Sequence, residues 1–286
     1  MITYPATIGG FKTRVIEAGQ GEEVILLVHG LGARADRWRS NIDELSSAGY
    51  RVIAFDLPGH GFAEKGPGDH YNVPAFAEMV QAVIEWIGKP KVHLVGTSLG
   101  GHTVGYFATK NPERVSSLSL VCSVGLIPVG SERRKRVSQR IGDASREGVV
   151  SKFKVLVYDQ SLVTEEWISE EVLINSSPGA SEALSALGTY FGEHLDNDVV
   201  GAELGSLCAA GRFRTMVLWG AQEVAYPLTM GIEAAAVITG SSLVAIEGTA
   251  HAPYFERPEA FNSVLVDFLK NHLGEINRDG VAYFSN

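Results

Sequence analysis

The stretch Gly96-Thr97-Ser98-Leu99-Gly100 decides how the rest of the sequence is interpreted. It has the form G-x-S-x-G, follows the apolar run Val92-His93-Leu94-Val95, and precedes a segment, 101–110, that we expect to be helical. A serine between two glycines at a strand-to-helix junction is typical of a nucleophile elbow, a sharp turn that exposes the hydroxyl at the sheet edge. The glycines lack the Cβ atoms that would hold strand and helix apart. We therefore predict that Ser98 is a nucleophile.

The composition is that of a globular chain, and its length suits one large α/β domain with an insertion, or two small domains. The chain has 286 residues, 45% of them hydrophobic, and a net charge of −9. This acidic balance argues against nucleic acid and anionic membranes as main partners. Residues 1–17 lack the pattern of a secretion signal, and no apolar run reaches membrane-spanning length. We interpret Cys122 and Cys208 as buried small hydrophobes in a reducing, cytoplasmic protein.

Six continuous apolar runs indicate strands that are covered on both faces, as in a parallel sheet. Two further strands precede them, joined at Gly9-Gly10 as a hairpin, and helical spacing of apolar residues separates most of the runs. This alternation predicts an α/β fold with a mostly parallel, eight-stranded sheet and helices on both faces. The expected strands are 3–8, 11–16, 24–28, 52–55, 92–95, 118–121, 216–219 and 243–246.

One interval, 127–207, breaks this alternation with helical segments that contain several aromatic residues. It is too long for a loop inside a compact domain. We interpret it as a helical cap over the carboxyl ends of the strands. The expected division is therefore a core in two parts, 1–126 and 208–286, with the cap 127–207 between them. The tail 275–286 is polar except for three residues, and the sequence suggests no function for it.

A serine hydroxyl needs a base to accept its proton and an acid to orient that base. His251 lies in Gly248-Thr249-Ala250-His251-Ala252-Pro253, directly after the last apolar strand, and is the predicted base. Glu223 is the one carboxylate in the loop after the strand 216–219 and is the predicted acid. The loop after Val121 offers no carboxylate. If Glu223 is not the acid, Glu247 is the next candidate.

An oxyanion hole requires backbone N–H groups that are aimed at developing negative charge. Leu99 follows the nucleophile and should supply one N–H group. The turn His29-Gly30-Leu31-Gly32 follows the first buried strand, and Leu31 should supply the other. Further candidate contacts to a small-molecule substrate between sheet and cap are Gly30, Thr97, Trp38, Phe153, Tyr158, Trp167, Phe191 and Tyr254.

The basic run Arg133-Arg134-Lys135-Arg136, with Arg140, opens the cap. It is either an anion site or the solvated face of a cap helix, and the acidic balance of the chain favours the solvated face. We expect neither a cofactor nor a metal, and as a protein partner we leave a second copy of the chain open.

These motifs together resemble an α/β-hydrolase with a helical cap, and the resemblance covers almost the whole chain. The motifs that carry it are His29-Gly30-Leu31-Gly32, Asp56-Leu57-Pro58-Gly59-His60-Gly61, 96–100 and His251. The resemblance implies a structural role for the Asp56 segment. The cap stretch Tyr158-Asp159-Gln160-Ser161-Leu162-Val163-Thr164-Glu165-Glu166 is similar to that of the hydrolases that cleave carbon–carbon bonds in ring-fission products of aromatic catabolism.

The chain departs from that branch at four positions. Where those enzymes usually have an arginine that binds a substrate carboxylate, this chain has Glu171, with Glu170 beside it. It also has Thr97 in place of asparagine, Ala252 in place of tryptophan and, as the acid, Glu223 in place of aspartate. Loss of an arginine–carboxylate contact removes a strong, directional interaction. We therefore expect a substrate other than the usual dienoate acids, and we expect a Glu171→Arg variant to favour acidic substrates if that side chain faces the pocket.

The hypothesis from the sequence is a serine hydrolase for a small, largely apolar carbonyl compound. The bond cleaved would be an ester, a lactone or an activated carbon–carbon bond next to a ketone. One alternative is a carbon–carbon hydrolase with altered carboxylate recognition. Others on the same fold are a cofactor-free oxygenase or lyase, and a ligand receptor that does not catalyse.

Overall fold

The computed structural model describes residues 1–68, 70–275 and 277–284. Within them one mixed sheet of nine strands has the order β1-β2-β4-β3-β5-β6-β7-β8-β9. The five neighbouring pairs from β4 to β8 are parallel, and β1, β2 and β9 pair antiparallel with their neighbours. The strands are β1 (Ile2–Ile8), β2 (Phe11–Ala18), β3 (Val24–Val28), β4 (Arg51–Phe55), β5 (Val92–Thr97), β6 (Val115–Val121), β7 (Arg214–Gly220), β8 (Ser242–Ile246) and β9 (Val281–Phe284).

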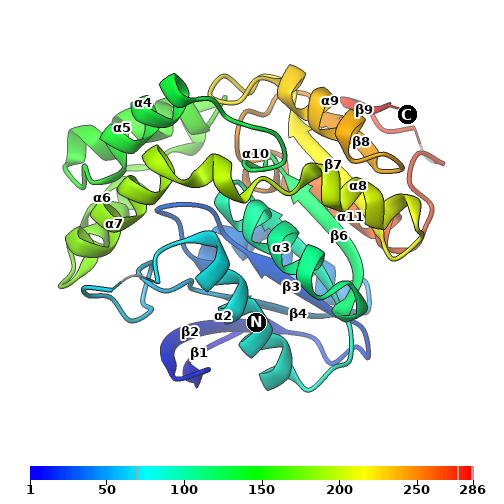
Figure 1. Cartoon of the computed structure of the whole chain (residues 1–286), viewed down its shortest axis with the longest axis horizontal. Coiled ribbons are helices and arrows are strands. Elements are labelled where there is room, and N and C mark those ends of the chain that lie inside the picture. The colour runs from blue at the N-terminus through cyan, green and yellow to red at the C-terminus, as the bar shows by residue number, and fades with distance from the viewer. Residues whose placement is uncertain (69, 276, 285–286) are drawn as a thin grey trace.

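Helices cover both faces of this sheet, which confirms the predicted α/β architecture (Figure 1). The contacts fall into two groups: α1 (Arg39–Ser47) packs on α11 (Pro258–Leu269), whereas α2 (Val73–Ile87), α3 (Leu99–Lys110), α8 (Gly201–Ala209) and α9 (Leu228–Val237) pack in succession. Strands β3 and β5 are buried at every residue, as apolar strands between two helical layers should be. Because the strands between β4 and β8 run parallel, their carboxyl ends lie at the same end of the sheet.

The prediction of eight strands was wrong by one. Val281–Phe284 in the tail forms β9, which pairs with β8 from Leu243↔Phe284 to Ile246↔Val281. Its sequence hides the strand because it is only four residues long and only Val281 is buried. The backbone of Glu247 continues the pairing by donating to the carbonyl of Gly280 at 2.8 Å. The tail thus shields the outer edge of β8, the strand that leads into the histidine loop.

The interval between β6 and β7 is helical, as predicted. It contains α4 (Ser131–Ile141), α5 (Arg146–Leu156), α6 (Glu165–Asn175), α7 (Ala180–Glu193) and α8. Helix α4 packs on α7 and α5 packs on α6, forming a layer beside the strand ends (Figure 1). Helix α8 packs instead on α3 and α9. The exact division at 127 and 207 stays a prediction. In the described part of the chain, no helix combines the length and apolar character that crossing a membrane requires.

Candidate active site

Ser98 forms the predicted sharp turn between β5 and α3. Its backbone has φ 54° and ψ −120°, a conformation that side-chain-bearing residues rarely adopt. The glycines of the motif make the turn sterically feasible: a Cβ on Gly96 would lie 2.3 Å from the Gly100 carbonyl oxygen, and a Cβ on Gly100 would lie 2.3 Å from that of His29. The Ser98 N–H donates to the Val121 carbonyl at 2.9 Å, which fixes the turn to β6.

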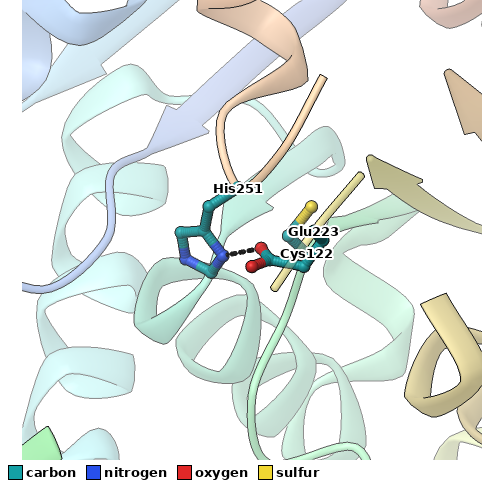
Figure 2. Close-up of side chains that lie close together, drawn as sticks. All are labelled: Cys122, Glu223 and His251. Carbon is teal, nitrogen blue, oxygen red and sulfur yellow. Dashed lines mark hydrogen bonds and ion pairs between the residues drawn. The ribbon is translucent and has the colours of Figure 1, made fainter. Parts of the chain in front are cut away.

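His251 and Glu223 meet across the loops that follow β8 and β7. The His251 Nδ1 and the Glu223 carboxylate form a hydrogen bond (Figure 2), and both side chains are buried. The other Glu223 oxygen accepts the N–H groups of Ala225 at 2.7 Å and Tyr226 at 3.4 Å. The carboxylate is therefore held by its own loop, so that it can fix the orientation and tautomer of the imidazole ring.

Ser98 and His251 both line a cavity of about 360 Å³ between the strand ends and the cap helices. In the described residues, the Ser98 Oγ makes no hydrogen bond, and contacts between a nucleophile and its base often tighten only when substrate binds. Gly30 leaves space around the Ser98 side chain, because a Cβ at Gly30 would lie 3.0 Å from the Ser98 Cβ and 3.6 Å from its Oγ. Apolar side chains form much of the remaining wall: Leu31, Val137, Ile141, Leu156, Leu184 and Phe191.

The two backbone segments that should form the predicted oxyanion hole both lie beside Ser98. Leu99 is the first residue of α3, and N–H groups in the first turn of a helix have no partner within the helix. The positive end of the helix dipole points the same way. Gly30, Leu31 and Gly32 line the cavity beside Ser98, in a turn closed by the Ala33 N–H on the Gly30 carbonyl at 3.2 Å. The assignment of the two N–H groups stays a prediction.

The structure divides the predicted substrate contacts into two sets. Gly30, Thr97, Phe191 and Tyr254 line the cavity, and their contact with a substrate stays a prediction. Four other aromatic side chains do not, and those predictions are corrected. Trp38 is fully buried and packs on Tyr254, which lines the cavity, and on Phe261. Tyr158 is 57% exposed.

Phe153 and Trp167 belong to a second hydrophobic cluster inside the cap, with Val149, Val157 and Ile168. The face of α5 explains the error. Val149, Lys152 and Leu156 recur at helical spacing and line the cavity, whereas Phe153 lies on the neighbouring face of the helix. Sequence reasoning selected the aromatic residue and missed Lys152. Helical spacing from Val149 fits Lys152 at i+3 and Phe153 at i+4 alike, so this signal would have raised Lys152 as a candidate without excluding Phe153.

Glu171 does not replace the missing arginine at the cavity wall. It is 1% exposed and binds Arg34 at 2.7 Å, Arg37 and Lys152, and it also accepts from Asn175 at 3.3 Å. Glu170 binds the same Arg34 at 2.6 Å. The expectation that Glu171→Arg would change substrate preference is therefore corrected: it would add a cation to a cluster that already has three.

This cluster ties cap helices α5 and α6 to the segment that follows β3. Burial would raise the pKa of Glu171, but the charges of Lys152, Arg37 and Arg34 outweigh burial and lower it to about 2. Burial lowers the pKa of Lys152, against the attraction of Glu171. Lys152 also donates to the Gly32 carbonyl at 3.2 Å. Because it lines the cavity as well, Lys152 is a cationic group beside the substrate space.

The basic run of α4 is largely a solvated face, as the sequence favoured. Lys135 and Arg136 are exposed, and Arg134 binds Asp196 at 3.0 Å. Arg140, one turn later, lines the cavity near Asp143. The run is therefore not one anion site, although its last member reaches the substrate space.

The Asp56 segment is built for structure rather than chemistry. Asp56 is fully buried and binds Arg14 at 2.9 Å and the Ala35 N–H at 2.7 Å. His29 accepts the Leu57 N–H at 2.9 Å, and burial lowers the pKa of His29 to about 4. Both nitrogens of the neutral His29 ring have hydrogen-bond partners, and the bond to Leu57 joins the end of β3 to the loop after β4.

Cys122, Glu223 and His251 are the one group in the described residues whose spacing could hold a metal ion, with ligand atoms within 4.8 Å of one another (Figure 2). The donor set fits a metal poorly. The His251 Nδ1 is committed to Glu223, and burial together with the nearby Glu223 charge raises the pKa of the Cys122 thiol, which opposes the thiolate a metal requires. Cys122 is buried as predicted, whereas Cys208 is only half-buried on α8.

Comparison with known proteins identifies the family. The family model for the alpha/beta hydrolase fold matches residues 23–258, so the chain belongs to that family. A hydrolase of 2-hydroxy-6-oxononadienedioate and 2-hydroxy-6-oxononatrienedioate from Escherichia coli strain K12 is 29% identical over 269 residues, which cover 88% of this chain and 89% of the relative. The resemblance to the carbon–carbon hydrolase branch is confirmed.

Solved structures also resemble almost the whole chain. The 2-hydroxy-6-oxo-6-phenylhexa-2,4-dienoate hydrolase from Rhodococcus sp. strain RHA1 has a TM-score of 0.82 at 22% identity, covering 94% of this chain and 98% of that one. At that identity the likeness concerns the fold alone. A thermophilic esterase from Thermogutta terrifontis has a TM-score of 0.75 at 25% identity, covering 95% and 99%.

Proposed function

We propose that the protein is a serine hydrolase for a small, largely apolar carbonyl compound. The observation that carries this proposal is the buried pair of His251 and Glu223 at the edge of the cavity that also exposes the strained Ser98. Ser98 would be the nucleophile, His251 the base and Glu223 the orienting acid. The N–H groups of Leu31 and Leu99 would bind the oxyanion.

The reaction would proceed in two halves. His251 Nε2 accepts the hydroxyl proton as Ser98 Oγ attacks the carbonyl carbon, and the resulting oxyanion receives the two N–H groups. His251 then returns the proton to the leaving group as the bond to the acyl carbon breaks. Water repeats the sequence on the acyl-enzyme, releasing the acid and restoring the serine. Each N–H group is worth about 3 kcal/mol in the transition state.

The cavity supports a substrate at the small end of the usual range. Its volume of about 360 Å³ is near the lower limit for ligand pockets. The wall is mostly apolar, and Lys152 and Arg140 are its cationic groups. Because Lys152 is already paired with Glu171, we propose uncharged or singly acidic substrates.

A carbon–carbon hydrolase with altered carboxylate recognition is the second candidate. The similarity to the Escherichia coli relative, a hydrolase of dienedioates, favours it. Glu171 is itself an anion and cannot take the place of the missing arginine, so Lys152 or Arg140 would have to bind a substrate carboxylate. The sequence-based expectations of a cytoplasmic location and of a possible homodimer stay predictions.

Turnover of p-nitrophenyl esters tests the proposal. We expect a burst of p-nitrophenol equal to the enzyme concentration, and a loss of turnover by at least about 1,000-fold in Ser98→Ala with folding intact. We also expect slow cleavage of a ring-fission dienedioate. A folded Ser98→Ala variant with undiminished turnover would refute the serine mechanism. Faster turnover of the dienedioate than of any ester would select the second candidate, and ligand binding without turnover would indicate a receptor.

A further inference from the structure

Glu256 lies at the end of a short helix, α10 (Pro253–Glu256), that begins two residues after His251. Its side chain is 9% exposed. One carboxylate oxygen accepts the N–H of Ala250 at 2.8 Å and that of Ala252 at 3.3 Å. The carboxylate therefore clamps the backbone on both sides of His251.

The other Glu256 oxygen reaches the cap. It accepts the N–H of Tyr158 at 2.5 Å, just beyond the end of α5. A second bond joins the same two segments, because the His251 N–H donates to the carbonyl of Leu156 at 3.1 Å. Leu156 is the last residue of α5 and lines the cavity. The histidine loop and the cap turn 156–158 are thus bound to each other at the cavity wall.

Packing supports the same connection. Phe255, next to Glu256, stacks on Trp167 of cap helix α6 with ring centroids 4.3 Å apart. Burial raises the pKa of Glu256, while the N–H donors around it oppose that rise. A buried carboxylate with no salt-bridge partner in the described residues is costly to maintain, and here backbone N–H groups from two regions supply its stabilisation.

We propose that Glu256 is a positioning residue through which the cap fixes the catalytic histidine. A substrate that fills the cavity as far as Leu156 presses on the cap turn, and the Glu256 carboxylate and the Leu156 carbonyl transmit that position to the His251 backbone. A short substrate that leaves Leu156 untouched does not use this connection. The inference depends on the proposed function, because it assigns His251 the role of base.

The Glu256→Gln variant tests the connection. The amide has one acceptor oxygen where the carboxylate has two, so it can serve either the histidine loop or the cap turn, but not both at once. Glu259→Gln is the matched control, because Glu259 is an exposed carboxylate three residues away. Circular dichroism confirms folding of both variants before kinetics.

The kinetic measurement compares p-nitrophenyl acetate with p-nitrophenyl hexanoate. In Glu256→Gln we expect kcat to fall about tenfold for the long acyl chain and no more than about twofold for the short one, with KM little changed. Glu259→Gln should match the unmodified protein with both esters. An equal loss with both esters would reduce Glu256 to a structural role, and no loss with either would also overturn the proposal.

Amide hydrogen exchange separates this proposal from the proposed function. If the unmodified protein cleaves neither ester, the hydrolase proposal fails, but the connection can still be measured. In Glu256→Gln we expect faster exchange both in peptides spanning 156–159 and in those spanning 249–252, because the amide can protect only one side at a time. Exchange in 249–252 equal to that of Glu259→Gln would overturn the connection, whatever the activity.

Discussion

Two buried carboxylates, Glu223 beside the sheet edge and Glu171 in the cap, have opposite surroundings. One Glu223 oxygen forms its side-chain hydrogen bond with His251, and the other oxygen is held by backbone N–H groups. Glu171 faces three cations, Arg34, Arg37 and Lys152. Both side chains are almost fully shielded from water, at 5% and 1% exposure.

The ionisable partner of each carboxylate therefore decides whether the carboxylate serves catalysis or holds the fold together. Arginine stays protonated at any working pH, so Glu171 holds a fixed charge that binds cap to core. Histidine gains and loses a proton near neutral pH, so Glu223 can stabilise a charge that forms only during turnover. Removing Glu223 should therefore abolish activity while sparing stability, and removing Glu171 should do the reverse.

The largest expected effect is that of Glu223→Gln on turnover. The amide is nearly isosteric, but it stabilises the imidazolium less and can favour the wrong tautomer, so kcat should fall by about 10,000-fold. Steady-state kinetics with a p-nitrophenyl ester measure the loss of turnover, and a thermal melt measures whether stability is kept.

Two variants calibrate this result. Glu223→Asp keeps the charge on a shorter side chain and should retain activity between those of the unmodified protein and Glu223→Gln. Glu247→Gln should change nothing, since Glu247 is exposed at the end of β8. Unimpaired turnover in Glu223→Gln, or a collapse in Glu247→Gln, would move the acid from Glu223 to Glu247.

The contrast between the two regions also explains what the sequence predicted. Ser98, Glu223 and His251 each follow a buried strand, and parallel strand ends meet at one edge whatever the loops do. The proximity of these three residues could therefore be predicted from the order of strands and motifs along the sequence. Glu171 meets Arg34 over 137 residues of sequence, and no periodic pattern connects them. Such a cap–core contact depends on how the cap is docked, which residue types do not encode locally.

The next largest effect is on stability. Glu171→Gln leaves Arg34, Arg37 and Lys152 without their shared carboxylate, and breaking a buried ion pair in this way costs about 3–5 kcal/mol. Glu170→Gln is the control, because Glu170 is 41% exposed and its main pairing is with Arg34 alone; it should cost at most about 1 kcal/mol. Urea unfolding compares the two. Equal midpoints would show that the cluster does not fasten the cap.

The same cluster predicts a dependence of stability on pH. Burial opposes ionisation of Glu171, but its three cations lower its pKa from 4.5 to about 2. A lowered carboxyl pKa contributes stability that is complete above about pH 5 and is lost as the pH falls from 4.5 toward 2. The contribution is about 3 kcal/mol. Glu171→Gln should therefore lose less stability than the unmodified protein between pH 5 and pH 2, and parallel pH curves of the melting temperature would contradict this.

The smallest effect should be that of Lys152, where the two regions meet. Its ammonium has three N–H donors, and in the described residues two of its acceptors are Glu171 and the Gly32 carbonyl. The third donor is available to a substrate, because Lys152 lines the cavity. Lys152→Met keeps most of the side-chain length and removes the charge, while Arg34 and Arg37 still neutralise Glu171. The loss of the Lys152 charge should lower kcat/KM for a substrate that carries one carboxylate, and it should leave kcat/KM for a neutral acyl group unchanged.

Mono-p-nitrophenyl succinate and p-nitrophenyl butyrate form the matched pair of substrates, since they differ by one terminal carboxylate. In Lys152→Met we expect kcat/KM for the succinate ester to fall about tenfold relative to the butyrate ester, the size of one charge-assisted hydrogen bond. Lys154→Met, an exposed lysine on the same helix, should leave the ratio unchanged. If the ratio holds in Lys152→Met, the charge of Lys152 belongs entirely to the cap cluster, and Arg140 becomes the cation that a substrate carboxylate would meet.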